Sequence, residues 1–158
     1  MKVFLSWSGP TSKRVALALR DWLPNVIQAI DPWMSSEDIE KGARWSADVA
    51  NELKTTKAGV VCVTPDNRHA SWLNFEAGAL SNAVAREMVC PYLFRLKPSD
   101  LTGPLAQFQM SEANKEDTQK MVATINKATD KPISEKKLLE ALELWWSKLE
   151  AQLIAMSI

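Results

Sequence analysis

The chain has 158 residues, of which 46% are apolar and 24% charged, so it can bury the core of one domain and is not disordered. Its 19 basic and 19 acidic side chains balance, which removes any general attraction to nucleic acid or to an anionic membrane. No apolar run approaches the length of a membrane span, so neither class of partner is expected.

The cysteines and the first residues favour a cytoplasmic location. Residues 1–7 are too short for the apolar region of a secretory signal and continue directly into domain sequence. Cys62 and Cys90 each stand in an apolar, strand-like run, so both are predicted to be buried, reduced thiols. Metal-ligand spacing is absent, so we expect no metal site.

In the first part of the chain, short apolar runs alternate with longer amphipathic ones. Strands are predicted over residues 3–7 and within residues 26–34, where Pro32 leaves the end of the strand open. Between them, Ser12 is predicted to cap a helix that Pro24 helps to end. After a polar loop, the next helix places four apolar side chains at helical spacing: Trp45, Val49, Ala50 and Leu53.

The third strand is the clearest, because residues 59–63 are apolar on both faces, as in a central parallel strand. It ends at a turn signal over residues 64–67. Ser71 is predicted to cap a helix from Trp72 to about Arg86. Two further strands are expected, over residues 89–96 and, as a short fifth strand, within residues 105–110.

Two helices are predicted in the last third, and the final one, about residues 134–156, has one apolar stripe for core packing: Leu138, Leu142, Trp145, Leu149 and Leu153. Alternating strands and helices indicate a single α/β domain over residues 1–158, with its core in about 1–130 and a parallel sheet covered on both faces. Ligands of such sheets bind outside the carboxyl ends of the strands. Four segments therefore form the candidate site: residues 6–12, 34–45, 64–71 and the loop after Leu96.

Glu76 is the most unusual residue in this pattern. At 100° per residue it falls in the middle of the apolar face of its helix, one turn after Trp72 and one turn before Leu80. A carboxylate in that position is costly unless it has a partner. Two interpretations stay open: an arginine or a backbone amide satisfies Glu76, or the first turn of the helix opens into the cleft at the strand ends and Glu76 points into it.

Four segments of the chain follow one another in a recognisable order. They are a first-strand box, Val3-Phe4-Leu5-Ser6-Trp7-Ser8; a loop after the second strand, residues 35–45; a third strand and its exit, residues 60–65; and the W-x-x-x-E pattern Trp72-Leu73-Asn74-Phe75-Glu76. Together they resemble the TIR (Toll/interleukin-1 receptor) domain family, in its bacterial, NAD-consuming form. In that family the second segment is called the BB loop.

The resemblance implies a flavodoxin-like three-layer sandwich with a five-stranded parallel sheet. It also implies that NAD is a substrate, and not a bound cofactor, and that its nicotinamide–ribose bond is cleaved to give nicotinamide and ADP-ribose or a cyclic isomer. By motif match Glu76 is the catalytic residue. Trp45, which follows the BB-loop glycine Gly42, is implied to lie near the nicotinamide ribose, with Trp72 supporting the pocket.

Further substrate-binding residues are expected on the first-strand turn, the second strand and the BB loop: Ser6, Trp7, Ser8, Trp33, Ile39 and Gly42. The turn over residues 6–12 and the first amides of the following helix are predicted to hold the pyrophosphate. One of Trp45, Trp33 and Trp7 is predicted to stack on a ring, and at least one of the three to be ordinary core.

One carboxylate suffices for this reaction on chemical grounds. Glycosidases commonly need a second carboxylic acid to protonate the leaving group. Nicotinamide is already cationic in NAD and leaves as a neutral ring, so the site must stabilise only the ribosyl cation. His69, the only histidine, stands in a polar turn and is expected to be a surface residue.

The resemblance also implies partners. Many members become active when subunits pack side by side through the BB loop, so a homo-oligomer or filament is expected, together with a sensor or effector domain or protein. The chain is expected to be a fragment of a longer protein. If that parent protein is bacterial, the resemblance implies a role in antiviral defence.

Three other functions stay open. The first is a non-catalytic TIR interaction module, although the BB loop lacks the Pro-Gly and the first strand lacks the Asp and Tyr of many animal signalling members. The second is an enzyme resembling nucleoside deoxyribosyltransferases, which share the architecture and use a glutamate nucleophile. The third is a flavodoxin-like FMN binder, suggested by the short turn at residues 6–11.

Overall fold

The computed structural model describes residues 1–34, 47–69 and 78–156. The described part contains one five-stranded sheet in which every pair is parallel, in the order β2-β1-β3-β4-β5. The strands are β1 (Lys2–Ser6), β2 (Asp31–Trp33), β3 (Thr56–Val63), β4 (Val89–Leu93) and β5 (Ser111–Glu112). This strand order is that of flavodoxin-like doubly wound folds, so the expected α/β architecture is confirmed.

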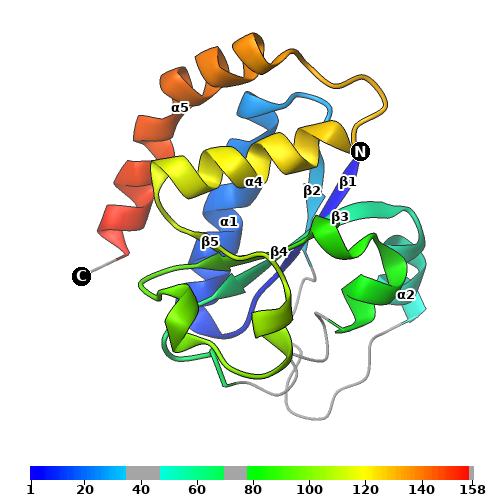
Figure 1. Ribbon diagram of the computed structural model, residues 1–158, viewed down its shortest axis with the longest axis vertical. Coiled ribbons are helices and arrows are strands. Elements are labelled where there is room, and N and C mark those ends of the chain that lie inside the picture. Colours follow the sequence, from blue (N-terminus) through cyan, green and yellow to red (C-terminus); the bar gives the residue numbers. More distant parts are fainter. Residues whose placement is uncertain (35–46, 70–77, 157–158) are drawn as a thin grey trace.

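Helices cover both faces of this sheet (Figure 1). The longer α-helices of the described residues are α1 (Gly9–Val26), α2 (Ala47–Lys54), α4 (Lys115–Lys127) and α5 (Glu135–Ala155). Residues 78–83 form a further α-helical segment, and three short 3₁₀ helices are η1 (Arg86–Met88), η2 (Pro98–Asp100) and η3 (Pro104–Gln107). Within the described residues, no helix combines the length and the apolar character that a membrane crossing requires.

Successive side chains of β1 point to opposite faces of the sheet, and the core is accordingly divided into two clusters. Val3, Leu5 and Trp7 belong to the cluster that buries α1, α4 and α5. Phe4 points to the other face, where Leu53 of α2 and Leu80 of the segment 78–83 are buried. Apolar residues on both faces of β1 and β3 are what makes these strands central.

Several predicted boundaries are corrected. Helix α1 begins at Gly9 with Ser8 at the N-cap, so Ser12 lies inside the helix and is not its cap. The helix can begin this early because Pro10 is favoured in a first turn, where its missing N–H leaves no donor to be capped. Pro24 lies within the last turn of α1, which ends at Val26. Pro32 lies inside β2, where it is tolerated because β2 is an edge strand.

Other corrections fall in the second half of the chain. The helix expected to reach Arg86 ends at residue 83, and Arg86 begins η1. Strand β4 ends at Leu93, short of Leu96. The prediction of a short fifth strand within residues 105–110 is wrong. Leu105 and Phe108 are buried, but they belong to the 3₁₀ turn η3 and its C-cap, whose apolar spacing resembles that of a strand.

The apolar stripe of α5 is confirmed except at one position. Leu138, Leu142, Leu149 and Leu153 are buried, but the tryptophan that joins them is Trp146, which continues the spacing of four residues after Leu142. Trp145 is only partly buried, its carbonyl accepts a hydrogen bond from Trp22 Nε1 at 2.8 Å, and Lys148 Nζ lies 4.6 Å from its ring centroid.

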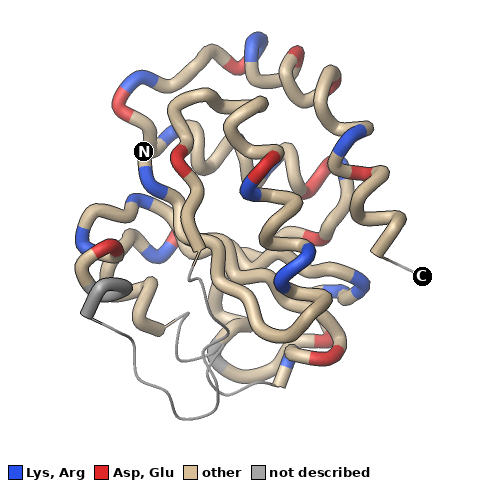
Figure 2. Tube along the Cα trace, turned by 180° about the vertical axis from the view of Figure 1, so that it is seen from behind, with Lys and Arg blue, Asp and Glu red and all other residues tan. Residues whose placement is uncertain are grey.

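Charge is spread over the surface of the fold. Basic and acidic positions are interspersed along the trace seen in Figure 2, in keeping with the balanced composition of the chain.

Cys62 and Cys90 are buried and unbridged, as predicted, and face the cluster that contains α1. Burial raises the pKa of the Cys90 thiol to about 12 and raises the pKa of Cys62 well above its usual range. Both thiols therefore stay protonated in the folded chain up to strongly alkaline pH.

This burial predicts a pH dependence of stability. In the unfolded chain each thiol ionises near pH 8.5, so above that pH the unfolded state binds fewer protons than the folded state and the free energy of unfolding falls. The expected loss is about 1.4 kcal/mol per pH unit for each thiol. Urea unfolding between pH 8 and 10 measures it, and a Cys62→Ala/Cys90→Ala variant should show a clearly smaller decline. Equal declines in the two proteins would contradict this account.

Candidate active site

The sheet order places its switch point between β1 and β3. The chain passes from β1 outward to β2 and then crosses to β3 on the other side of β1. In open α/β sheets the loops that leave the carboxyl ends at this point diverge and form the ligand crevice. The loops that follow Ser6 and Val63 are therefore the first segments to consider.

Two buried side chains join these loops. Asn67, 4% exposed, donates from Nδ2 to the carbonyl of Ser8 at 2.9 Å and to that of Cys62 at 3.2 Å. Its Oδ1 accepts the N–H of Thr64 at 2.7 Å. Ser12, fully buried, donates from Oγ to the carbonyl of Cys62 at 2.8 Å and accepts the N–H of Ser8 at 3.0 Å. The two loops thus share one hydrogen-bond network.

Further contacts bring the fourth predicted segment, the loop after Leu96, into the same region. Gly9 has φ +81° and lies so close to the β3 exit that a Cβ on it would be 3.5 Å from Asp66 Oδ2. Arg68 Nη1 donates to the carbonyl of Asp100 at 3.4 Å, which connects the β3 exit to the loop after Leu96. Of the four predicted segments, only residues 34–45 lie almost wholly outside the described residues, which include Met34 alone.

Ser6 and Trp7, both predicted substrate-binding residues, are buried on opposite faces of the sheet. Ser6 is 1% exposed and is paired with Val61, on the face that carries Leu80. Trp7 is 5% exposed and belongs to the core cluster of α1, with Lys13 Nζ 5.2 Å from its ring centroid. The expectation that at least one of the three candidate tryptophans is ordinary core is therefore confirmed at Trp7.

Trp33 occupies the end of β2 on the same face as Phe4. The two ring centroids are 4.4 Å apart with an interplanar angle of 35°, and Trp33 Nε1 donates to Thr56 Oγ1 at 3.1 Å. The side chain is half-buried, so part of it stays accessible in an orientation that the hydrogen bond fixes. Stacking of Trp33 on a substrate ring stays a prediction.

The remaining predicted residues lie outside the described residues: Ile39, Gly42, Trp45, Trp72 and Glu76. His69 is exposed, as expected. Among the described residues, no group of three or more His, Cys, Asp or Glu side chains lies close enough together to hold a metal ion.

Comparison with known proteins identifies the family. The family model of the TIR domain matches residues 3–125, which is more than half of the chain. The chain belongs to the TIR domain family. Comparison with curated proteins gives no match. A similar solved structure is that of the TIR domains in the activated Roq1 resistosome, which directly recognises the pathogen effector XopQ; identity is 17% over 94% of this chain and 83% of that chain, with a TM-score of 0.45.

A close approach holds one helix of this TIR domain against the sheet. Gly59 of β3 faces Leu80, and a Cβ on Gly59 would lie 2.7 Å from Leu80 Cδ1. Leu80 is fully buried, and it follows Glu76 by four residues in the sequence. Glycine at residue 59 therefore sets how near the described segment 78–83 comes to β3.

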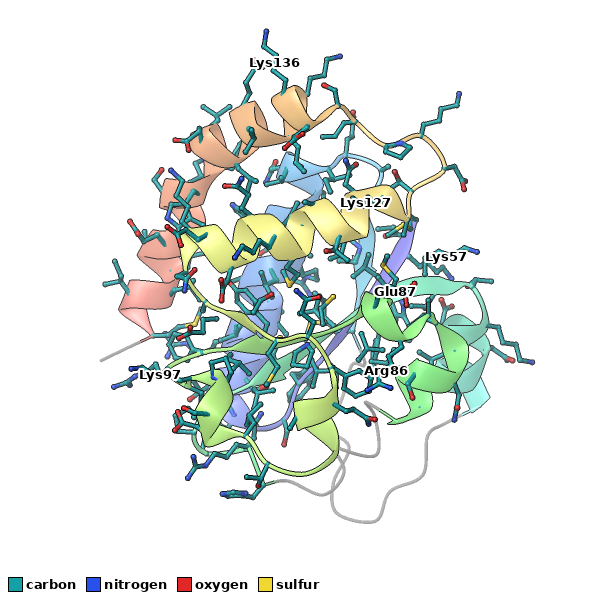
Figure 3. The ribbon with its side chains drawn as sticks, viewed as in Figure 1. Lys57, Arg86, Glu87, Lys97, Lys127 and Lys136 are labelled. Carbon is teal, nitrogen blue, oxygen red and sulfur yellow. The ribbon has the colours of Figure 1, made fainter. Side chains whose placement is uncertain are left out.

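A groove of about 720 Å³ lies where β4 and β5 end, on the side of the sheet that α5 covers. It is bounded by the exits of β4 and β5 and by the second half of α5, and its lining includes the loop after Leu96. Charged side chains of both signs line it: Arg95, Lys97 (labelled in Figure 3), Asp100, Glu112, Lys115 and Glu150. Arg95 has φ +60°, in the region that favours glycine, so the groove contains the one non-glycine residue with positive φ in the described part.

Sequence reasoning missed the roles of Asn67 and Ser12. The sequence pattern indicates Asn67 only as part of a turn, and Ser12 only as a helix cap. Asparagine in the turn that follows a buried strand carries both an acceptor and a donor group, so it is a residue type that can cross-link loops. No signal in the sequence identifies Ser8 as the residue that both side chains contact.

The close approach at Gly59 gives a testable prediction. Gly59→Ala should lower the free energy of unfolding by about 1–3 kcal/mol, because Leu80 must move to admit the Cβ. Gly78→Ala is the matched control: a Cβ on Gly78 would have no atom within 4 Å, so alanine should be neutral or stabilise the helix by up to about 1 kcal/mol. Urea unfolding of both variants measures the difference, and equal stabilities would contradict the proposed crowding.

Proposed function

We propose that this TIR domain cleaves the nicotinamide–ribose bond of NAD, with Glu76 stabilising the ribosyl cation. The observation that carries the proposal is family membership over residues 3–125 together with the W-x-x-x-E pattern at Trp72 to Glu76. By helical periodicity the sequence puts Glu76 on the face that also carries Leu80, and Leu80 is buried against β3.

The described strand exits support the proposal. A dinucleotide needs a crevice at the carboxyl edge with hydroxyl and amide groups for its phosphates and riboses. The loop after β1 provides the hydroxyl group of half-buried Ser8, and the network of Asn67 and Ser12 holds this loop against the loop after β3. The helix α1 begins at Gly9, so its first amides are directed to the same edge.

The reaction balances without a general acid for the leaving group. The bond between ribose C1′ and the nicotinamide nitrogen breaks, and its electron pair neutralises the cationic ring. A carboxylate beside the ribose stabilises the resulting cation and accepts hydrogen bonds from the ribose hydroxyls. Water then adds to C1′ and releases a proton, which gives ADP-ribose; attack by another group of the same molecule gives a cyclic isomer.

A single substitution tests the catalytic residue. Glu76→Gln keeps the size of the side chain and removes its charge, so the release of nicotinamide from NAD should fall by about a hundredfold or more. Chromatography of free nicotinamide measures the rate. Glu87→Gln is the matched control, because Glu87 is an exposed residue of η1, which precedes β4 and thus lies at its amino end (Figure 3). Full activity of Glu76→Gln would refute the assigned role.

We propose further that self-assembly through the BB loop, residues 35–45, switches the activity on, in the cytoplasm and in a defence role. The proposal rests on family membership and on the resemblance of the loop sequence. The pairing of a second copy would complete the site without changing its chemistry.

The assembly proposal predicts a dependence on concentration. Activity per protomer should rise at least several-fold between low and high protein concentration, or on addition of a crowding agent, because association follows mass action. Light scattering recorded beside nicotinamide release identifies the active species. A specific activity that is constant over a thousandfold range of concentration would contradict self-assembly. Absence of release under every condition would favour the non-catalytic interaction module.

A further inference from the structure

We infer that Asn67 and Ser12 are positioning residues for the substrate: they hold the backbone of Ser8 so that its hydroxyl is presented to the phosphate or ribose oxygens of a dinucleotide. The inference rests on the proposed function and adds residues to the same site. It follows from the hydrogen bonds, the burial and the helix cap at the β1 exit.

The first observation concerns the Ser8 side chain. Ser8 is the N-cap of α1, yet its side chain makes no capping hydrogen bond. An N-cap serine ordinarily accepts an N–H from the second or third residue of the helix, and here Pro10, one of the first residues of α1, has none to donate. The side chain is half-buried. The hydroxyl of Ser8 is therefore not committed to the helix start.

The second observation is that the Ser8 backbone is held from both sides. Its N–H donates to Ser12 Oγ at 3.0 Å, and its carbonyl accepts from Asn67 Nδ2 at 2.9 Å. Ser12 is fully buried and Asn67 is 4% exposed, so water does not compete effectively for these bonds. The orientation of Ser8 is thus determined by two side chains that a substrate need not touch.

Both side chains share an anchor on the neighbouring strand. The carbonyl of Cys62 in β3 accepts from Ser12 Oγ at 2.8 Å and from Asn67 Nδ2 at 3.2 Å. Asn67 is fixed in addition by the N–H of Thr64 at 2.7 Å. Ser8 is therefore positioned relative to β3, across the switch point, and not only by its own helix.

A second asparagine of the chain provides a matched control. Asn126, 6% exposed, donates to the carbonyl of Ile133 at 2.9 Å and accepts its N–H at 3.1 Å. It stands near the end of α4, beside Lys127, which Figure 3 labels. Because α4 follows β5 and runs back across the sheet, this end lies toward the amino ends of the strands. Asn126→Ala removes an equally buried loop contact away from the candidate site.

The experiment compares substrate affinity with stability. Asn67→Ala and, independently, Ser12→Ala should raise the KM of NAD and its Kd in calorimetry about tenfold, while kcat changes less than threefold, since a contact made equally in ground and transition states affects binding alone. Asn126→Ala should lose comparable stability in urea unfolding and keep KM within twofold. Ser8→Ala should raise KM about as much as Asn67→Ala.

A double variant separates positioning from general loosening. If Asn67 acts through the Ser8 hydroxyl, Asn67→Ala should change KM less than twofold in a Ser8→Ala background, because the effects of coupled residues do not add. Two results overturn the inference: an unchanged KM in Asn67→Ala or Ser12→Ala, or the same rise in KM with and without the Ser8 hydroxyl. If Asn67→Ala does not fold, Ser12→Ala and its double variant with Ser8→Ala decide.

The proposed function and this inference can fail separately. A wild-type chain that binds NAD but releases no nicotinamide refutes the catalytic proposal, while the Kd values of the variants still test the positioning. If activity depends on Glu76 but the Kd for NAD is unchanged in the Asn67→Ala, Ser12→Ala and Ser8→Ala variants, only the inference is overturned. A wild-type chain that neither binds nor cleaves NAD overturns both.

Discussion

The parallel pairing of β1 with β3 is the constraint on which the rest of the structure depends. It joins Val3 to Ala58 and Ser6 to Val61 in register, and both strands are buried on both faces. Because the chain between them travels outward to form β2 and returns, their exits diverge at the carboxyl edge. The core and the candidate site thus arise from the same pairing, one along the strands and the other at their ends.

Polar groups at the exits are buried without being left unsatisfied. Backbone groups of Ser8, Cys62 and Thr64 all find partners in Asn67 or Ser12, at distances of 2.7–3.2 Å. An unpaired buried carbonyl or amide costs on the order of 1–3 kcal/mol, so this network makes the turn geometry specific. A rigid exit is also what a binding site requires, since ordering a loop at the moment of binding weakens affinity.

The two faces of the sheet contribute differently to the site. On one face, α1, α4 and α5 form a continuous apolar cluster in which Trp7 and the two thiols are enclosed. On the other face, Gly59 lets Leu80 approach β3 closely, and half-buried Trp33 lies beside Phe4. Ser6 faces this second side. The face that carries Leu80, four residues after Glu76 in the sequence, is therefore the one with small residues and accessible aromatic surface.

Much of the fold and part of the site could be predicted from the sequence by itself. The periodicity of apolar residues determined that this is a parallel α/β domain, that residues 59–63 lie at its centre and that Cys62 and Cys90 are buried, because local spacing reports which side of an element faces the core. Ordered motifs similarly determined the family.

Tertiary structure alone decided where β5 lies, since apolar residues in a 3₁₀ turn and in a strand look alike in sequence. It alone decided that Trp146 and not Trp145 is buried, that Asn67 reaches Ser8 from the loop after β3, and that Ser12 donates a hydrogen bond to Cys62 of β3. Those contacts join residues up to 59 positions apart, and their geometry depends on strand pairing, which no local pattern encodes.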